Sequence, residues 1–222
     1  MCGRFTLTQS AETVAEVFDL AAVPPLTPRY NIAPTQSVAA VLLAPERRDR
    51  ELKMLRWGLI PAWAKDAKIG ARTINARSET VTEKPAFRTA FLKRRCLVIA
   101  DGFYEWERRE NAKQPFYFRL KYGKLFAFAG LWECWQPADG EAISSCTILT
   151  AEANELVRPI HDRMPVILDP TDWEQWLNPE VRSPELLQPL LRPHSALDMT
   201  AHPVSTLVNN PSNDSDQCVS SL

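Results

Sequence analysis

Residues 96–106 read CLVIADGFYEW, and this stretch anchors the predicted fold. The apolar run at 96–100 predicts a buried β-strand. Glu105 follows between aromatic residues at the end of that strand. Burial raises the pKa of a carboxyl group, so this position favours acid–base chemistry. A paired surface carboxylate is the alternative interpretation of Glu105.

The surrounding sequence predicts more strands than helices, and the strands are not regularly separated by helices. The predicted strands are 38–43, 52–57, 115–120, 125–131, 143–149 and 165–168. The predicted helices are 10–20, 85–92, 151–157, 170–177 and 184–191. The last two have proline in the first turn behind Asp169 or Ser183. This order indicates an α+β fold with a curved, mostly antiparallel sheet.

The length of 222 residues fits a single domain, which we assign to residues 1–210. The segment 24–34 holds four prolines and is expected to be an ordered loop or the entry to a strand. From residue 211 onward the sequence is polar, and we expect a disordered tail at 211–222.

Composition excludes several classes of protein. Hydrophobic residues make up 45% and charged residues 24%, as in soluble globular proteins. No apolar run approaches the ~20 residues that a bilayer-spanning helix needs. The five scattered cysteines and three histidines argue against a disulfide framework or a metal site, and they fit the cytoplasm. With a net charge of -1, contact with a polyanion requires a local arginine cluster.

The chain begins MCGRF, residues 1–5, so removal of Met1 would make Cys2 the N-terminus. Cys2 would then carry an α-amine with a pKa of roughly 7.7–8.0 beside a thiol with a pKa of about 8.5. Such an aminothiol can attack an amide, or it can condense with an aldehyde to form a thiazolidine ring. Alternatively, Cys2 is only a small residue that suits methionine removal.

Three further segments carry candidate functional residues. Residues 57–63 place Trp63 in a loop, where it forms either a stacking surface for bases or a hydrophobic cluster. If residues 74–79 are extended, Asn75 and Arg77 point to the same face; a capped helix start is the alternative. His161 precedes an aspartate and Arg163, and a histidine in this setting is either a proton shuttle or a structural residue.

Together these segments closely resemble the SOS-response-associated peptidase (SRAP) family, whose members process abasic sites in DNA. The resemblance runs through 1–5, 29–34, 57–63, 74–79, 100–106, 161–165 and 202–205. It implies a single barrel-like α+β domain flanked by short helices.

The resemblance also implies a reaction and roles for four residues. Mature Cys2 would condense with the aldehyde of an abasic site in single-stranded DNA and close a thiazolidine crosslink. Asn75 would hold the amine or the sugar oxygen, Glu105 would act as acid and base, and His161 would move protons at the sugar. Glu105 would also assist the removal of Met1, and the reaction would need no metal or organic cofactor.

The remaining implied roles concern DNA binding. Arg4, Arg77 and Arg163 would bind phosphates, because arginine donates in a planar bidentate geometry. Trp63 and Trp106 would stack or wedge against bases. We expect a cytoplasmic monomer, nucleoid-associated if the protein is bacterial, without a membrane or obligate protein partner.

Three other functions remain possible at this stage. An N-terminal-nucleophile amidotransferase also begins Met-Cys-Gly and would release ammonia from an amide. A non-covalent reader of single-stranded or modified DNA would use the tryptophans and arginines alone. A protease acting on other proteins would use the same aminothiol, although self-removal of Met1 explains the same residues without a second protein as substrate.

Overall fold

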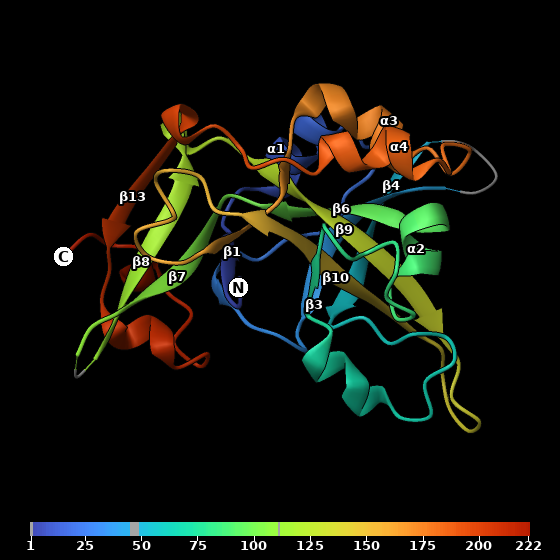
Figure 1. Ribbon diagram of the computed structural model, residues 1–222. Helices are drawn as coiled ribbons and strands as arrows, with labels where there is room; N and C mark the ends of the chain where they lie inside the picture. The colour runs from blue at the N-terminus through green and yellow to red at the C-terminus, as the bar shows by residue number, and fades with distance from the viewer. Residues whose placement is uncertain (1, 45–48, 111) are drawn as a thin grey trace.

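The structure is a computed structural model that describes residues 2–44, 49–110 and 112–222. Figure 1 shows two sheets beside each other, with the N-terminal segment between them and the C-terminus beside the smaller sheet. Helices α1 (Ala11–Phe18), α3 (Trp173–Leu177) and α4 (Pro184–Leu187) lie together at the top of this view.

The larger sheet closes into a barrel. Its ring consists of β3 (Ser37–Leu43), β4 (Arg50–Trp57), β10 (Ile143–Glu152), β9 (Phe126–Trp135) and β6 (Arg95–Ala100). Only the β4–β10 pair in this ring is parallel. Short strands β5 (Asn75–Arg77), β11 (Arg163–Pro165) and β12 (Ile167–Leu168) extend it. The predicted α+β class with a curved, mostly antiparallel, barrel-like sheet is confirmed.

The smaller sheet has the order β13 (Met199–Pro203), β8 (Lys113–Leu120), β7 (Gly102–Arg108), β1 (Phe5–Leu7) and β2 (Arg29–Ile32). Strand β7 begins directly after β6, so the chain passes from barrel to sheet at Asp101. Glu105 therefore lies within a strand and not at the end of one. The Pro-rich segment 24–34 does enter a strand, β2.

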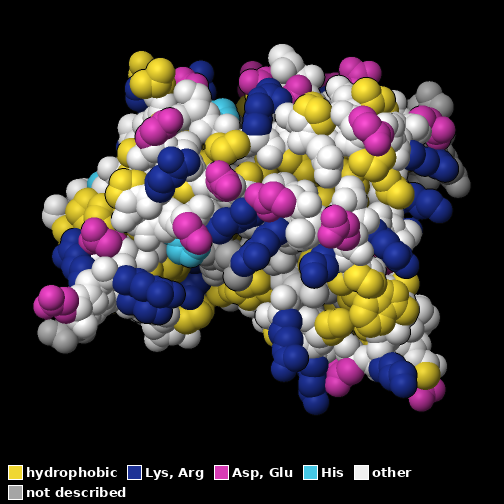
Figure 2. All heavy atoms as spheres, viewed as in Figure 1, with side chains coloured by type: hydrophobic (Ala, Val, Ile, Leu, Met, Phe, Trp, Pro, Cys, Tyr) yellow, Lys and Arg dark blue, Asp and Glu magenta, His cyan; other side chains and the backbone are white. Residues whose placement is uncertain are grey.

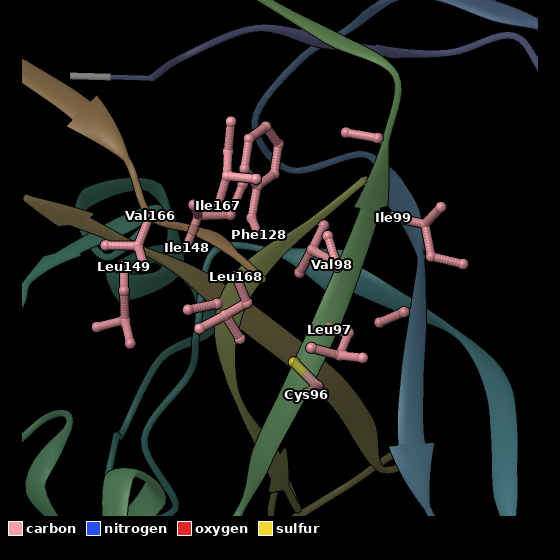
Figure 3. Packing of buried hydrophobic residues seen from close by; sticks show 14 of the residues in the cluster. Cys96, Leu97, Val98, Ile99, Phe128, Ile148, Leu149, Val166, Ile167 and Leu168 are labelled. Atoms are coloured by element: carbon pink, nitrogen blue, oxygen red, sulfur yellow. The ribbon is translucent and has the colours of Figure 1, made fainter. Parts of the chain in front are cut away.

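Apolar side chains from all sides fill the barrel. Figure 3 shows Val98, Phe128, Ile148 and Val166 among the buried residues of this core. The ring of Phe5 packs edge-on against Trp57 and Phe128, with centroids 5.1 and 5.7 Å away. The N-terminal strand is thus anchored in the barrel core.

The helices are short. Ser10 caps α1 by accepting a hydrogen bond from the Thr13 amide at 3.3 Å. The prediction at 85–92 corresponds to α2 (Arg88–Lys93), and those at 170–177 and 184–191 correspond to α3 and α4 with adjoining 3-10 turns. The prediction of a helix at 151–157 was wrong: the chain continues β10 to Glu152 and then turns, because β10 pairs with β11 there.

The segment 211–222 differs from the disordered tail that its polar composition led us to expect. It contains a 3-10 turn, Asp216–Cys218, and a β-bridge between Val204 and Ser221. Cys218 is buried in a second small core with Tyr104 and Tyr117. Tertiary contacts made by a few residues outweigh the polar composition of the segment.

Asp101 holds the N-terminal strand against β7. Its carboxylate accepts hydrogen bonds from the Thr6 hydroxyl and, at 2.6 Å each, from the amide and hydroxyl of Thr8. The Thr6 hydroxyl also lies 2.9 Å from that of Tyr117. These donors lie on or next to β1, so Asp101 fixes the strand that leads back to Cys2.

The Asp101→Ala variant should lose about 3 kcal/mol of unfolding free energy, because buried donors lose a charged acceptor. Chemical denaturation measures this loss. The exposed Asp139→Ala is the control and should change the unfolding free energy by less than ~0.5 kcal/mol. Equal effects of the two substitutions would show that the Asp101 network does not anchor β1.

Candidate active site

A cavity of about 390 Å³ lies where the N-terminal segment meets β7, β8 and the loop before β11. Its lining residues are Arg4, Glu105, Trp106, Arg108, Lys113, His161 and Asn209. Four of the nine predicted site residues therefore line one cavity. Figure 2 shows Lys and Arg side chains in several separate groups on this face, with acidic side chains between them.

The pairing of β1 with β7 places Cys2 close to Glu105. Phe5 pairs with Phe103, and the Tyr104 amide donates to the Arg4 carbonyl at 3.0 Å. Continuing this antiparallel register carries the chain past Glu105 toward Cys2. The Cys2 side chain is fully buried, and its Sγ lies 3.8 Å from the Arg4 carbonyl oxygen.

The Cys2 thiol is held in its neutral form. Burial raises its pKa far above the usual range, and the charge of Glu105 raises it further. A neutral thiol is a weak nucleophile, so Cys2 needs a base or a change in its surroundings to react.

Glu105 has properties suited to acid–base chemistry. Its side chain is buried, and its pKa is raised to about 7, mainly by this burial and to a small part by the charge of Asp162. At neutral pH both the acid and the carboxylate are populated, so Glu105 can give or accept a proton at little cost. The raised pKa expected from the sequence is confirmed.

His161 lies at the same cavity in a defined hydrogen-bonding state. Burial lowers its pKa, which favours the neutral imidazole. Its Nδ1 accepts from the Arg163 amide at 2.9 Å and also lies 3.0 Å from a carboxylate oxygen of Asp162. The backbone donor is fixed whereas the Asp162 side chain is exposed, so we place the imidazole proton on Nε2.

Asn75 connects Cys2 to the barrel. Its Nδ2 donates to the Cys2 carbonyl at 2.7 Å, and β5 pairs in parallel with β10. The buried Oδ1 of Asn75 has no hydrogen-bond donor among the described residues. As the extended geometry predicts, Ala76 is buried between Asn75 and the exposed Arg77.

Arg163 and Arg77 differ in availability. Both Nη atoms of Arg163 bond to Glu79, at 2.7 and 2.9 Å, and Nη2 donates to the Thr150 carbonyl at 2.5 Å. The Arg163 side chain is only 12% exposed, and its charge is already paired with that of Glu79. Arg77 is exposed at the end of β5 and can reach a ligand without breaking such bonds.

Arg4 and Trp106 form one wall of the cavity. The Arg4 guanidinium lies 5.8 Å from the ring centroid of Trp106. Its Nη1 donates to the Asn31 side chain and to the Val208 carbonyl, each at 2.6 Å. The Trp106 indole donates to the Asn209 side chain at 2.7 Å.

The tryptophans of the 57–63 segment have separate roles. Trp57 is buried and donates to the Ile74 carbonyl at 2.9 Å, so it belongs to the core. Trp63 is 61% exposed, and it does not line the cavity around Glu105. Its large exposed ring is compatible with the stacking surface expected from the sequence.

Sequence reasoning missed three cavity residues. Arg108 and Lys113 flank the turn between β7 and β8, and their charges next to the Glu105 strand were a usable signal. Asn209 had no such signal, because only the folded C-terminal segment brings it to Trp106.

Within the described ranges, no group of three or more His, Cys, Asp or Glu side chains is arranged to hold a metal ion. None of the helices in the same ranges has both the length and the apolar character to cross a bilayer.

The chain belongs to the SOS response associated peptidase (SRAP) family, whose profile matches residues 1–211. The abasic site processing protein YoaM of Bacillus subtilis is 49% identical, and the match covers 97% of this chain and 96% of that protein. The abasic site processing protein HMCES of Xenopus tropicalis is 37% identical, over 88% of this chain and 66% of that protein.

Solved structures share the fold. A protein from Bacteroides thetaiotaomicron superposes with a TM-score of 0.89 at 27% identity, covering 100% of both chains. A protein from Bordetella bronchiseptica gives a TM-score of 0.77 at 30% identity, covering 92% of this chain and 100% of that one.

The raised pKa of Glu105 predicts how stability depends on pH. The folded-state pKa of about 7 exceeds the usual 4.5, so folding favours the protonated carboxyl group. Its stabilising contribution is therefore complete below pH ~4.5 and is lost as the pH rises through about 7. Glu105→Gln should gain stability relative to wild type as the pH rises over this range, approaching ~3 kcal/mol, since one pKa unit corresponds to ~1.4 kcal/mol.

Denaturation at pH 5 and pH 8, on chains that retain Met1, measures this difference. Glu107→Gln, on the same strand but more exposed, is the matched control and should show a smaller pH dependence. A stability difference between Glu105→Gln and wild type that does not change with pH would contradict the raised pKa.

Proposed function

We propose that this protein captures abasic sites in single-stranded DNA through a thiazolidine crosslink to Cys2, formed after Met1 is removed. The observation that carries the proposal is the burial of Cys2 beside Glu105, whose pKa is about 7, at a cavity lined by Arg4, Trp106 and His161. Family membership and relatives named abasic site processing proteins support it.

The proposed reaction joins an aminothiol to an aldehyde. Hydrolysis of the Met1–Cys2 peptide bond, autocatalytic in our proposal, frees the Cys2 α-amine. The amine nitrogen adds to C1′ of the opened sugar, and the resulting carbinolamine loses water to give an imine. The thiol sulfur then adds to the imine carbon while its proton passes to the nitrogen. One water molecule is released, and no oxidant, metal or organic cofactor is consumed.

Glu105 serves both proton-transfer steps. As the acid it protonates the departing hydroxyl of the carbinolamine, and as the carboxylate it can accept the thiol proton. Its pKa of about 7 keeps both forms available at neutral pH. As a base, it can also activate water for Met1 hydrolysis, which gives the protein peptidase activity on its own N-terminus.

Asn75 and His161 would assist the reaction through hydrogen bonds. Asn75 already bonds the Cys2 carbonyl, and its buried Oδ1 can accept a hydrogen bond from the freed amine or from a sugar hydroxyl. The neutral His161 can donate a hydrogen bond from Nε2 to the sugar oxygen, which stabilises the charge that develops there when the ring opens and again when the crosslink is released.

DNA binding would rest on phosphate contacts and stacking. Arg4 and Arg77 are the leading phosphate contacts, with Arg108 and Lys113 at the cavity edge. Arg163 acts mainly by holding Glu79. Because its charge is already paired with Glu79, any contact that Arg163 makes with a phosphate would be weaker. Trp63 and Trp106 stack on bases, each worth ~1–3 kcal/mol. We propose that the protein acts as a cytoplasmic monomer.

Covalent capture is the first test. Protein lacking Met1 should shift an oligonucleotide with one abasic site on a denaturing gel, because a thiazolidine survives where phosphate contacts do not. Cys2→Ala should still bind the strand without a covalent bond, so it should give no shifted band on the denaturing gel. An intact strand of the same sequence is the substrate control. Ammonia release from glutamine would favour the amidotransferase, while salt-sensitive binding without a shift would favour the non-covalent reader.

The two arginines next to the β5–β10 pair should differ. Arg77→Ala should weaken binding to undamaged single strands and reduce the salt slope by about 0.7, as expected for one lost phosphate contact. Arg163→Ala should mainly lower the melting temperature, because it breaks the Glu79 ion pair. Arg192→Ala, an exposed arginine that does not line the cavity, is the control. An unchanged salt slope in Arg77→Ala would remove Arg77 from the DNA-binding surface.

A further inference from the structure

Asp214 binds the outer edge of the smaller sheet. Strand β2 is the last strand of that sheet, with only β1 beside it. The Asp214 carboxylate accepts from the backbone amides of Tyr30 and Asn31, at 2.5 and 2.9 Å, and pairs with the Arg29 guanidinium at 2.5 Å. One side chain of the C-terminal segment thus satisfies donors that the sheet leaves unpaired.

Asn31 continues the connection into the site. Its side chain is fully buried, and its Nδ2 donates to the carbonyls of Val208, Asn210 and Asn213, at 3.2, 3.0 and 2.6 Å. Its Oδ1 accepts from Arg4 Nη1 at 2.6 Å. Asn31 therefore links three carbonyls of the folded C-terminal segment to the guanidinium of a cavity residue.

The same segment supports the other residues of that wall. Arg4 Nη1 donates to the Val208 carbonyl, and the Trp106 indole donates to Asn209. Val208 and Cys218 are buried against Tyr104, whose hydroxyl donates to the Tyr30 carbonyl at 2.7 Å. Residues 208–218 thus hold Arg4 and Trp106 in place through hydrogen bonds and through packing against Tyr104.

We infer that Asp214 and Asn31 are positioning residues. Together with the folded C-terminal segment they fix the Arg4 side chain in the conformation that contacts the DNA strand. The family profile ends at residue 211, so Asp214 lies beyond the matched region. An arginine side chain has many rotamers, and holding it in one conformation before binding removes an entropic cost from association. The inference rests on the proposed function only for the identity of the strand that Arg4 contacts.

Asp214→Asn in the full chain is the test, with Asp216→Asn as its matched control. Asp216 is exposed in the same segment, so its substitution removes the same charge without removing the β2 contact. The Asp214→Asn variant should exchange its Tyr30 and Asn31 amide protons faster than wild type. This readout is independent of activity.

The functional readout is the rate of crosslinking to an abasic single strand, and the affinity for the same strand without the lesion. Asp214→Asn should lower both by about tenfold, the equivalent of one lost charged hydrogen bond. In the Arg4→Ala background the same substitution should have little further effect, because Asp214 acts through Arg4. Asp216→Asn should match wild type in both measurements.

Two results would overturn the inference. One is an Asp214→Asn variant that crosslinks and binds as Asp216→Asn does. The other is a tenfold loss that persists undiminished in the Arg4→Ala background, which would indicate general destabilisation. If Asp214→Asn does not fold, Asp214→Glu keeps the charge and should give an intermediate loss through Arg4. Absence of any crosslink in wild type would refute the proposed function, while the affinity and amide exchange would still test the positioning role.

Discussion

The pairing of β1 with β7 is the constraint on which the site depends. Phe5 opposite Phe103 sets the register, and Asp101 locks the strand by accepting from Thr6 and Thr8. In the proposed mature form Cys2 is the first residue, so its position must come from the residues that follow it. Here those residues place the Cys2 thiol inside the protein near the buried carboxyl group of Glu105.

Burial then sets the chemistry of the site. It raises the pKa of both Cys2 and Glu105. At neutral pH the site therefore holds a neutral thiol near a carboxyl group that is partly protonated and partly ionised. A neutral thiol protects the protein from unwanted oxidation and alkylation. In the proposed reaction the substrate brings an aldehyde to the freed amine, so the site would select electrophiles that fit the cavity.

The sequence predicted the fold class and the local secondary structure around several candidate residues. It did not predict which residues distant in the sequence they contact. The apolar run at 96–100 and the extended Asn75–Arg77 segment followed from local patterns. Closure of the barrel through the β9–β10 pair is a long-range contact that no local pattern contains. The engagement of Arg163 with Glu79 and the packing of the C-terminal segment escaped prediction for the same reason.

The central claim is that Cys2 supplies both its amine and its sulfur to one carbon of the abasic sugar. Mass spectrometry of the N-terminal peptide from crosslinked protein, after borohydride and iodoacetamide treatment, tests this most directly. The account predicts a peptide without Met1 that carries the sugar with loss of one water, resists reduction and cannot be alkylated at Cys2. A crosslinked peptide that takes up two hydrogens and is alkylated at Cys2 would show a simple imine and contradict the account.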